Sequence, residues 1–231
     1  MLLVLLLIIG AILAFLFLRN TMPTHGPAAT MTRLWHRTSL LILGIKVHVH
    51  GERQDANVLF VPNHISWLDI SILGALIPTH FLSKAEILYW PVIGMLASRT
   101  GTLYIQRGSR DASARSNDVM RRALEQQHNI VLFAEGTTTD GSMRKFHGRL
   151  MQSAIDAKGQ IQPVALLQLY DGVNIFGIRK HTNRNRGHIM YIRSAVSMYN
   201  QRPGAAGTDK TKLACFYIQH TIYECEVMTP H

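Results

Sequence analysis

The sequence predicts an α/β protein with a mixed, mostly buried central sheet flanked by helices, preceded by an N-terminal transmembrane or membrane-embedded helix. Three observations predict this fold. Short apolar runs alternate with helical patterns after residue 45, which is typical of a sheet covered by helices. The first eighteen residues carry no charge. With 231 residues, 47% of them hydrophobic, the chain is long and apolar enough for one domain with a sizeable core, and it is not intrinsically disordered.

The N-terminal run over 1–18 predicts a membrane anchor that extends to Arg19. Its length is near the lower end of the ~20 residues that cross a hydrocarbon core as a helix. A signal peptide, the first alternative, needs a basic start and a small-residue cleavage site, and neither is convincing here. A hairpin that enters one leaflet is the second alternative. We therefore assign 1–19 to the anchor.

Charge indicates the class of partner and the orientation. Lys and Arg number 24 against 14 Asp and Glu, a formal net charge of +10, so the expected partner is anionic: nucleic acid, an anionic membrane or a phosphate-bearing substrate. No nucleic-acid-binding module is recognisable, and the anchor argues against that partner. The basic residues that precede the first acid, Glu52, are Arg19, Arg33, Arg37 and Lys46. This bias predicts that everything after the anchor lies on the cytoplasmic side of the membrane.

Residues 20–45 predict a connector followed by a membrane-proximal helix, and 46–231 predict the main folded domain. Within the first range, 21–30 is a Pro/Gly-containing connector, and 34–45 is an apolar helix that lies on the membrane or opens the core. The candidate strands are 46–50, 58–62, 81–84, 103–106, 130–134, 163–168 and 189–193. The candidate helices are 68–76, 86–97, 112–127, 149–157 and 210–227.

The segment that ends the second candidate strand carries the first candidate chemistry. The strand ends at Pro62, His64 follows in the turn, and Ser66 is a good N-cap with Asp69 in a capping-box position. On a continuous helix, residues five apart diverge by ~140°, so only the turn lets His64 and Asp69 meet. A neutral imidazole held by a carboxylate is a general base for a hydroxyl. Spacing alone favours the plainer interpretation, in which Asp69 only caps the helix.

Several familiar kinds of site are absent from the sequence. There is no P-loop, no G-x-S-x-G elbow and no H-E-x-x-H pattern. His48 and His50 share a strand face but lack a nearby third ligand, so no metal site is predicted. Neither Cys215 nor Cys225 has a base beside it in the sequence, and a cysteine nucleophile therefore has no support.

Asn63 and His64, with Asp69 five residues after the histidine, resemble the first motif of the glycerolipid acyltransferases, the family of 1-acyl-sn-glycerol-3-phosphate and lysophospholipid acyltransferases. Three more blocks resemble motifs of this family and follow in the family's order. The second comprises Lys84, Glu86, Pro91, Gly94 and 101–107. The third is 133–137, and the fourth is Pro163 with Val164. Together they cover about residues 46–170. The resemblance implies that 46–231 is an acyltransferase catalytic domain, and it favours a catalytic pair of His64 and Asp69 over a plain helix cap.

The resemblance implies a direct acyl transfer. His64, oriented by Asp69, would remove the proton from the free hydroxyl of 1-acyl-sn-glycerol-3-phosphate, and the oxygen would attack the thioester of acyl-CoA or acyl carrier protein. The product would be phosphatidic acid. No cofactor and no metal are implied, because N–H groups and arginine can stabilise the oxyanion.

The resemblance also implies the residues that bind the acceptor headgroup. Arg107, at a strand end, offers a forked cationic donor set for a phosphate. Glu135, Gly136 and Thr137 follow an apolar strand. Glu135 stands where the family binds the acceptor or orders the site, and Gly136 permits a tight turn that exposes N–H groups to an anion. The supporting positions are Asn63, Ser66, Lys84, Lys145 and Pro163.

One departure keeps the acceptor open. Thr138 stands where arginine is common among the phosphate-acceptor enzymes, which removes a cation from the expected headgroup pocket. The run from Thr137 to Gly141 also resembles the lyso-ornithine-lipid acyltransferases, whose acceptor has no phosphate. O-acylation of lyso-ornithine lipid is therefore the first alternative. An acyl-thioesterase that uses water instead of the hydroxyl, and a non-enzymatic membrane-surface protein, are the others.

Overall fold

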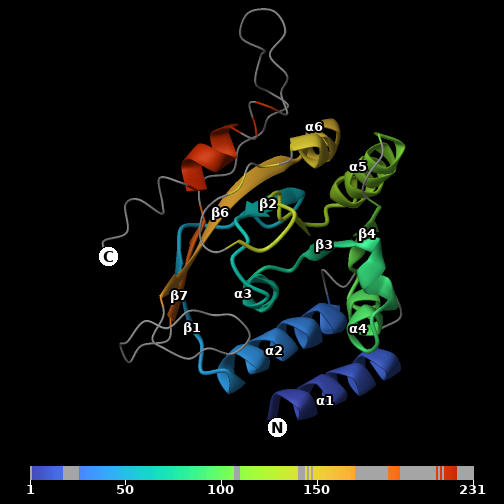
Figure 1. Ribbon diagram of the computed structural model, residues 1–231, viewed down its shortest axis with the longest axis vertical. Helices are drawn as coiled ribbons and strands as arrows, with labels where there is room; N and C mark the ends of the chain where they lie inside the picture. The colour runs from blue at the N-terminus through green and yellow to red at the C-terminus, as the bar shows by residue number, and fades with distance from the viewer. Residues whose placement is uncertain are drawn as a thin grey trace, which may run out of the picture.

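A mixed sheet lies between two layers of helices in the computed structural model (Figure 1). The residues that the structure describes are 2–17, 26–106, 110–139, 144, 146, 148–169, 187–192, 212, 214 and 216–222. Within them the sheet has seven strands in the order β1-β7-β6-β2-β5-β3-β4. The predicted fold class, a central sheet flanked by helices, is confirmed.

The strands of the sheet are β1 (Lys46–His50), β2 (Val58–Pro62), β3 (His80–Lys84), β4 (Leu103–Ile105), β5 (Ile130–Val131), β6 (Gln160–Leu169) and β7 (Gly187–Ile192). β2 to β6 run parallel to one another. β7 is antiparallel to β6, and β1 pairs parallel with β7. The C-terminal ends of β2, β3 and β5 therefore lie at one edge of the sheet, where ligand sites of parallel sheets are usually built.

The helices are α1 (Leu2–Phe17), α2 (Gly26–Ile42), α3 (Leu68–Leu76), α4 (Ile93–Arg99), α5 (Arg110–Glu125) and α6 (Gln152–Asp156), with 3-10 helices η1 (Ala85–Tyr89) and η2 (Gly148–Met151). Two expectations were wrong. The connector expected over 21–30 is helical from Gly26, and Pro27 fits there because a first-turn residue needs no N–H partner. The helix expected over 86–97 is two helices, since Pro91 lacks an N–H and Val92 takes a φ of 61°.

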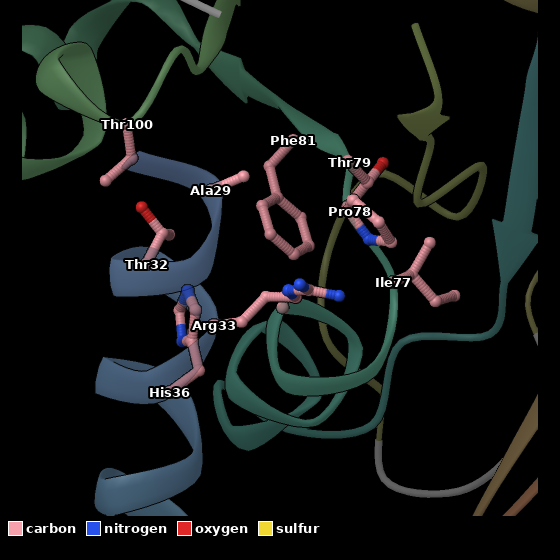
Figure 2. Close-up of a pocket in the computed structure, with 10 residues that line it drawn as sticks. Ala29, Thr32, Arg33, His36, Ile77, Pro78, Thr79, Phe81 and Thr100 are labelled. Atoms are coloured by element: carbon pink, nitrogen blue, oxygen red, sulfur yellow. The ribbon is translucent and has the colours of Figure 1, made fainter. Parts of the chain in front are cut away.

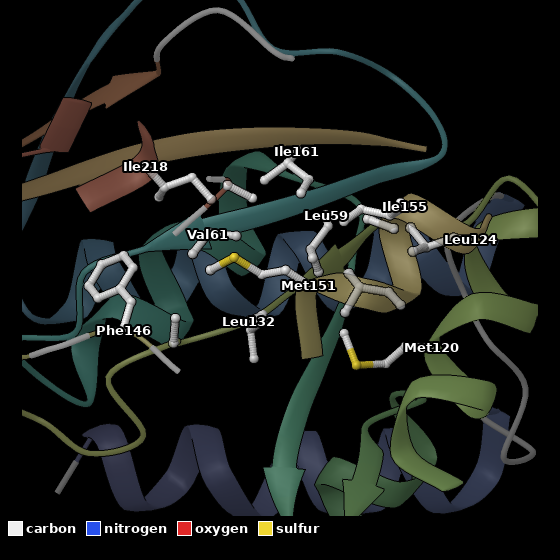
Figure 3. Close-up of a cluster of buried hydrophobic side chains, with 14 of the residues drawn as sticks. Leu59, Val61, Met120, Leu124, Leu132, Phe146, Met151, Ile155, Ile161 and Ile218 are labelled. Atoms are coloured by element: carbon white, nitrogen blue, oxygen red, sulfur yellow. The ribbon is translucent and has the colours of Figure 1, made fainter. Parts of the chain in front are cut away.

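The central strand β2 is buried on both faces. Val58 and Phe60 pack with α2 and α3. Leu59 and Val61 face the other way, into the cluster that α5, α6 and the helical residues 216–222 complete (Figure 3). A parallel strand covered on both faces is a continuous apolar run. This is why the sequence predicted the bounds of β2 correctly.

The N-terminal helix α1 packs against α2 and α4 (Figure 1). Trp35 Nε1 donates a hydrogen bond to the carbonyl of Leu6, and a Cβ at Gly10 would lie 2.3 Å from that nitrogen, so only glycine allows this approach. Among the described residues, no helix has both the length and the apolar character needed to cross a bilayer. The transmembrane helix expected over 1–18 is thus not found there.

Candidate active site

The turn between β2 and α3 brings His64 and Asp69 together, as the sequence analysis predicted. His64 Nδ1 lies 2.9 Å from Asp69 Oδ2. Because an ionised carboxylate only accepts hydrogen bonds, Nδ1 carries the hydrogen of this bond, and the Nε2 lone pair is left to accept a proton. The side chain of His64 is 15% exposed and that of Asp69 is 0% exposed. An imidazole held in this way by a buried carboxylate can act as a general base.

The same Asp69 oxygen also caps the helix. Oδ2 accepts the main-chain N–H groups of Ile65 at 2.8 Å and Ser66 at 2.9 Å, while Ser66 Oγ accepts the N–H of Leu68 at 3.1 Å. The bond from Ser66 N–H to Asp69 is one half of a capping box, but Ser66 Oγ accepts the N–H of Leu68 and not that of Asp69, and the helix itself begins at Leu68. The two interpretations of Asp69, helix cap and partner of His64, are therefore both correct.

Asn63 fastens the end of β2 to the neighbouring strand. Its Nδ2 donates to the carbonyl of Leu166 at 3.0 Å, and its Oδ1 accepts the N–H of Leu166 at 2.7 Å. The side chain thus extends the pairing of β2 with β6 beyond Pro62, the last paired residue of β2. Since both partners are buried, this pair of bonds fixes where the turn of His64 begins.

The loop after β5 holds the main chain of His64 from both sides. Glu135 Oε1 accepts the N–H of His64 at 3.0 Å, and Oε2 accepts the N–H of Arg144 at 3.3 Å. Thr139 donates its N–H to the carbonyl of His64 at 2.8 Å. Burial raises the pKa of the Glu135 carboxyl, and the N–H bonds from His64 and Arg144 offset only part of this effect. This geometry suits an ordering role for Glu135; contact with the acceptor remains a prediction.

Phe133 packs its ring on the imidazole of His64, with ring centroids 3.9 Å apart and planes inclined by 25°. This contact and the bonds from Thr139 were not expected from the sequence. In the sequence, Phe133 is only the first residue of a motif block. No local pattern predicts its stacking on His64, because this contact depends on the alignment of β2 with β5.

The remaining expected site residues are distributed as follows. Gly136 takes a φ of 76° and donates its N–H to the carbonyl of Phe133, which makes the expected tight turn, and Thr137 is exposed next to it. Lys84 is exposed at the end of β3. Pro163 is buried in β6 opposite Val61. Arg107 and Lys145 lie outside the described residues.

A small pocket lies between α2, α3 and the start of β3 (Figure 2). Arg33, His36 and Phe81 are among the residues that line it. His36 is buried, which lowers its pKa to about 4. The pocket adjoins Gly74 and Ile77 at the C-terminal end of α3, whereas His64 precedes its N-terminus. It is therefore separate from the His64 site. No group of three potential metal-ligating residues occurs in the described part of the chain.

The chain resembles known acyltransferases in sequence. A family model described as "Acyltransferase" matches residues 45–167, more than half of the chain. A lyso-ornithine lipid O-acyltransferase from Pseudomonas aeruginosa is 48% identical over 147 residues, which are 62% of this chain and 55% of that protein. A 1-acyl-sn-glycerol-3-phosphate acyltransferase from Neisseria gonorrhoeae is 36% identical over 132 residues, 57% of this chain and 51% of that protein.

Among solved structures, the crystal structure of a 1-acyl-sn-glycerophosphate acyltransferase from Thermotoga maritima superimposes with a TM-score of 0.65. The match covers 88% of this chain and 81% of that chain at 17% sequence identity, so it concerns the fold alone. The chain spans about half the length of the curated relatives it matches.

Proposed function

Because the chain belongs to the acyltransferase family, as the sequence motifs predicted, we propose that it is a membrane-associated enzyme that transfers an acyl chain from a thioester to the free hydroxyl of a lysolipid. The observation that carries the proposal is the hydrogen bond from His64 Nδ1 to the fully buried Asp69. It leaves Nε2 of this partly exposed side chain as the proton acceptor, at the sheet edge where parallel strands end.

The proposed reaction is a direct transfer. His64 Nε2 takes the proton from the lysolipid hydroxyl while the oxygen forms a bond to the thioester carbonyl carbon. Asp69 stabilises the resulting imidazolium. The tetrahedral oxyanion requires hydrogen-bond donors, which main-chain N–H groups of the loop after Gly136 and the guanidinium of Arg107 would supply. When the carbon–sulfur bond breaks, the imidazolium returns its proton to the departing thiolate. The donor would be acyl-CoA or acyl carrier protein, and no cofactor takes part.

The fixed position of His64 supports this role. Its ring is held by Asp69 and Phe133, and its main chain by Glu135 and Thr139. A base that must reach one hydroxyl gains rate from such preorganisation, because little motion remains to be frozen in the transition state. A solvated turn histidine would need none of these four contacts.

Two acceptors have comparable support. The phosphate of 1-acyl-sn-glycerol-3-phosphate would meet Arg107, with Arg144 and Lys145 nearby in the sequence, and the product would be phosphatidic acid. Lyso-ornithine lipid fits Thr138, which replaces a cation, and the Pseudomonas aeruginosa relative bears the name of that activity. Neither acceptor requires a different base.

Membrane attachment belongs to the same proposal. The exposed side of α1 is apolar, and the chain carries a net charge of +10, which favours an anionic bilayer. We place the catalytic domain at the cytoplasmic face of the inner membrane, because the anionic lipids of that leaflet would attract the basic chain.

The test is product identification with purified protein, an acyl thioester and both lysolipids at equal concentration. The proposal predicts a diacyl product, and the preferred acceptor is the one whose ester accumulates first. Release of free fatty acid without any ester would instead establish a thioesterase. If neither ester nor acid formed with acyl-CoA or with acyl carrier protein as donor, a non-enzymatic membrane-surface protein would be the better account.

A further inference from the structure

Exposed apolar side chains are concentrated in two parts of the molecule. Of the nineteen large hydrophobic residues that are exposed in the described chain, seven lie on α1 and five lie in the segment 88–93. The five, which we call the apolar tip, are Leu88, Tyr89, Trp90, Val92 and Ile93. Tyr89 is 82% exposed and Trp90 is 55% exposed. Single exposed apolar residues are ordinary, but a contiguous group marks an interaction surface.

The backbone presents this tip in one defined conformation. Val92 has a φ of 61° and a ψ of −56°, and the N–H of Ile93 bonds back to the carbonyl of Pro91, which makes a γ-turn. A positive φ is unusual for a β-branched residue and persists only where the surroundings impose it. Here a Cβ at Gly94 would lie 2.3 Å from the carbonyl oxygen of Leu88, so the chain closes tightly on itself. The backbone therefore holds the apolar tip in a defined conformation.

The apolar tip is connected to α1 through α4. Figure 1 shows α4 beside α1, and the two helices are in contact. Arg99, in the last turn of α4, donates a hydrogen bond to the carbonyl of Phe15 at 3.1 Å and lies over the Phe15 ring, 5.1 Å from its centroid. The tip and the exposed side of α1 thus belong to one connected unit.

We infer that the apolar tip is a second membrane contact, separate from α1, in which Tyr89 and Trp90 lie at the headgroup level of an anionic bilayer. This inference rests on the proposed function, because a lysolipid acceptor resides in a membrane. Tyrosine and tryptophan favour this level, where the ring is apolar and the polar end stays hydrated. Lys84 and Arg99 flank the tip, with Glu86 between them, and the whole chain is strongly basic.

The apolar tip lies on the same side of the molecule as His64. The tip follows β3, and His64 follows β2, and these strands run parallel on either side of β5. Both features therefore lie at the same edge of the sheet. Simultaneous contact of α1 and the apolar tip with a bilayer would fix the orientation of the protein. The sheet edge that carries His64 would then face the lipid.

The test uses the fluorescence of Trp90 in the full-length chain. The protein has three tryptophans, so substituting Trp35→Phe and Trp67→Phe leaves Trp90 as the only indole. The matched control adds Trp90→Phe and Phe216→Trp, which places the single indole at a position that is exposed on the opposite helical layer. Both chains are mixed with phosphatidylethanolamine and phosphatidylglycerol vesicles, with and without brominated acyl chains.

We expect the emission of Trp90 to shift to shorter wavelength on vesicle binding and to lose intensity with brominated lipid, while the indole at position 216 shows neither change. If the emission of Trp90 stays as insensitive to the vesicles as that of the control, the inference is overturned, and a protein would be the better occupant of this surface.

A kinetic test separates the failure of this inference from the failure of the proposed function. The double substitution Tyr89→Ser with Trp90→Ser is expected to lower kcat/KM roughly tenfold or more for a lysolipid presented in vesicles. It leaves kcat/KM for a short-chain, monomeric lysolipid unchanged, as does Phe216→Ser for both substrates. Equal losses for both substrates would mean that the tip is structural. The fluorescence result stands even if no acyl transfer is found.

Discussion

Glu135 accepts a hydrogen bond from the main-chain N–H of His64 at 3.0 Å, although the two residues are 71 positions apart in the chain. The bond joins the turn after β2 to the loop after β5, and the second oxygen of Glu135 extends the connection to Arg144. A buried acidic side chain thus holds two loops that parallel strands bring to one edge of the sheet. The position of the candidate base depends on this connection.

Substituting Glu135→Gln tests that connection. The amide can accept only one of the two N–H groups and turns its own N–H donors toward the other, so we expect a loss of about 1–3 kcal/mol in the free energy of unfolding. The turn of His64 loosens, and kcat/KM falls by about tenfold or more. Denaturant unfolding and steady-state kinetics measure the two effects. Glu125→Gln, which removes an exposed ion pair with Arg121, should change neither by much.

Substituting Asn63→Ala removes the two bonds to Leu166. The buried N–H and C=O groups of Leu166 lose their side-chain partner, so the free energy of unfolding should fall by about 2–4 kcal/mol. Urea unfolding monitored by circular dichroism measures this loss. Gln152→Ala breaks an exposed side-chain bond to Asp156 and serves as the control. A loss no larger than that of the control would contradict the proposed role of Asn63.

The pH dependence of stability should report the buried His36. Burial lowers its pKa from 6.5 to about 4 in the folded protein. The unfolded chain therefore binds a proton first as the pH falls, and stability that is complete above pH 6.5 declines between about 6.5 and 4. Unfolding measured across this range should show a shallower decline for His36→Gln than for the unsubstituted chain. A slope for His36→Gln identical to that of the unsubstituted chain would refute the assignment.

Substituting Asp69→Asn separates charge from helix capping. The amide oxygen can still accept the N–H groups of Ile65 and Ser66, but the imidazolium of the transition state loses its negative partner. We expect kcat to fall about a hundredfold or more while KM changes little. Asp118→Asn, on the exposed side of α5, is the matched control. A fall in stability with unchanged kcat would leave Asp69 as a helix cap only.

Local patterns predicted the parts of the fold that are decided locally. The bounds of β1, β2 and α3 agree with the expectation, because apolar runs there are closed by turn residues and by Ser66. β6 begins at Gln160, earlier than the expected start at Pro163. Gln162, a polar residue typical of a loop, is buried there because its amide bonds to the carbonyl of Glu52 and the N–H of Gln54. Hydrogen bonds of a side chain to main-chain groups about a hundred residues away cannot be predicted from the local sequence.

The candidate site shows the same division. The spacing of His64 and Asp69 across a turn was readable, since the capping box and the strand end are both local features. The contacts of His64 with Phe133, Glu135 and Thr139 could not be predicted from the sequence, because they arise from the alignment of β2 with β5. The exposure of the apolar tip at 88–93, which we propose as a second membrane contact, also depends on packing.

The rate of acyl transfer by His64→Ala is the most direct measurement of the central claim, with the exposed His48→Ala as control and circular dichroism to show that both chains remain folded. Removing a general base typically costs about a hundredfold to ten-thousandfold in rate. We expect a loss of this size for His64→Ala and an unchanged rate for His48→Ala. A folded His64→Ala protein that transfers acyl chains within about tenfold of the unsubstituted rate would contradict the assignment of the base.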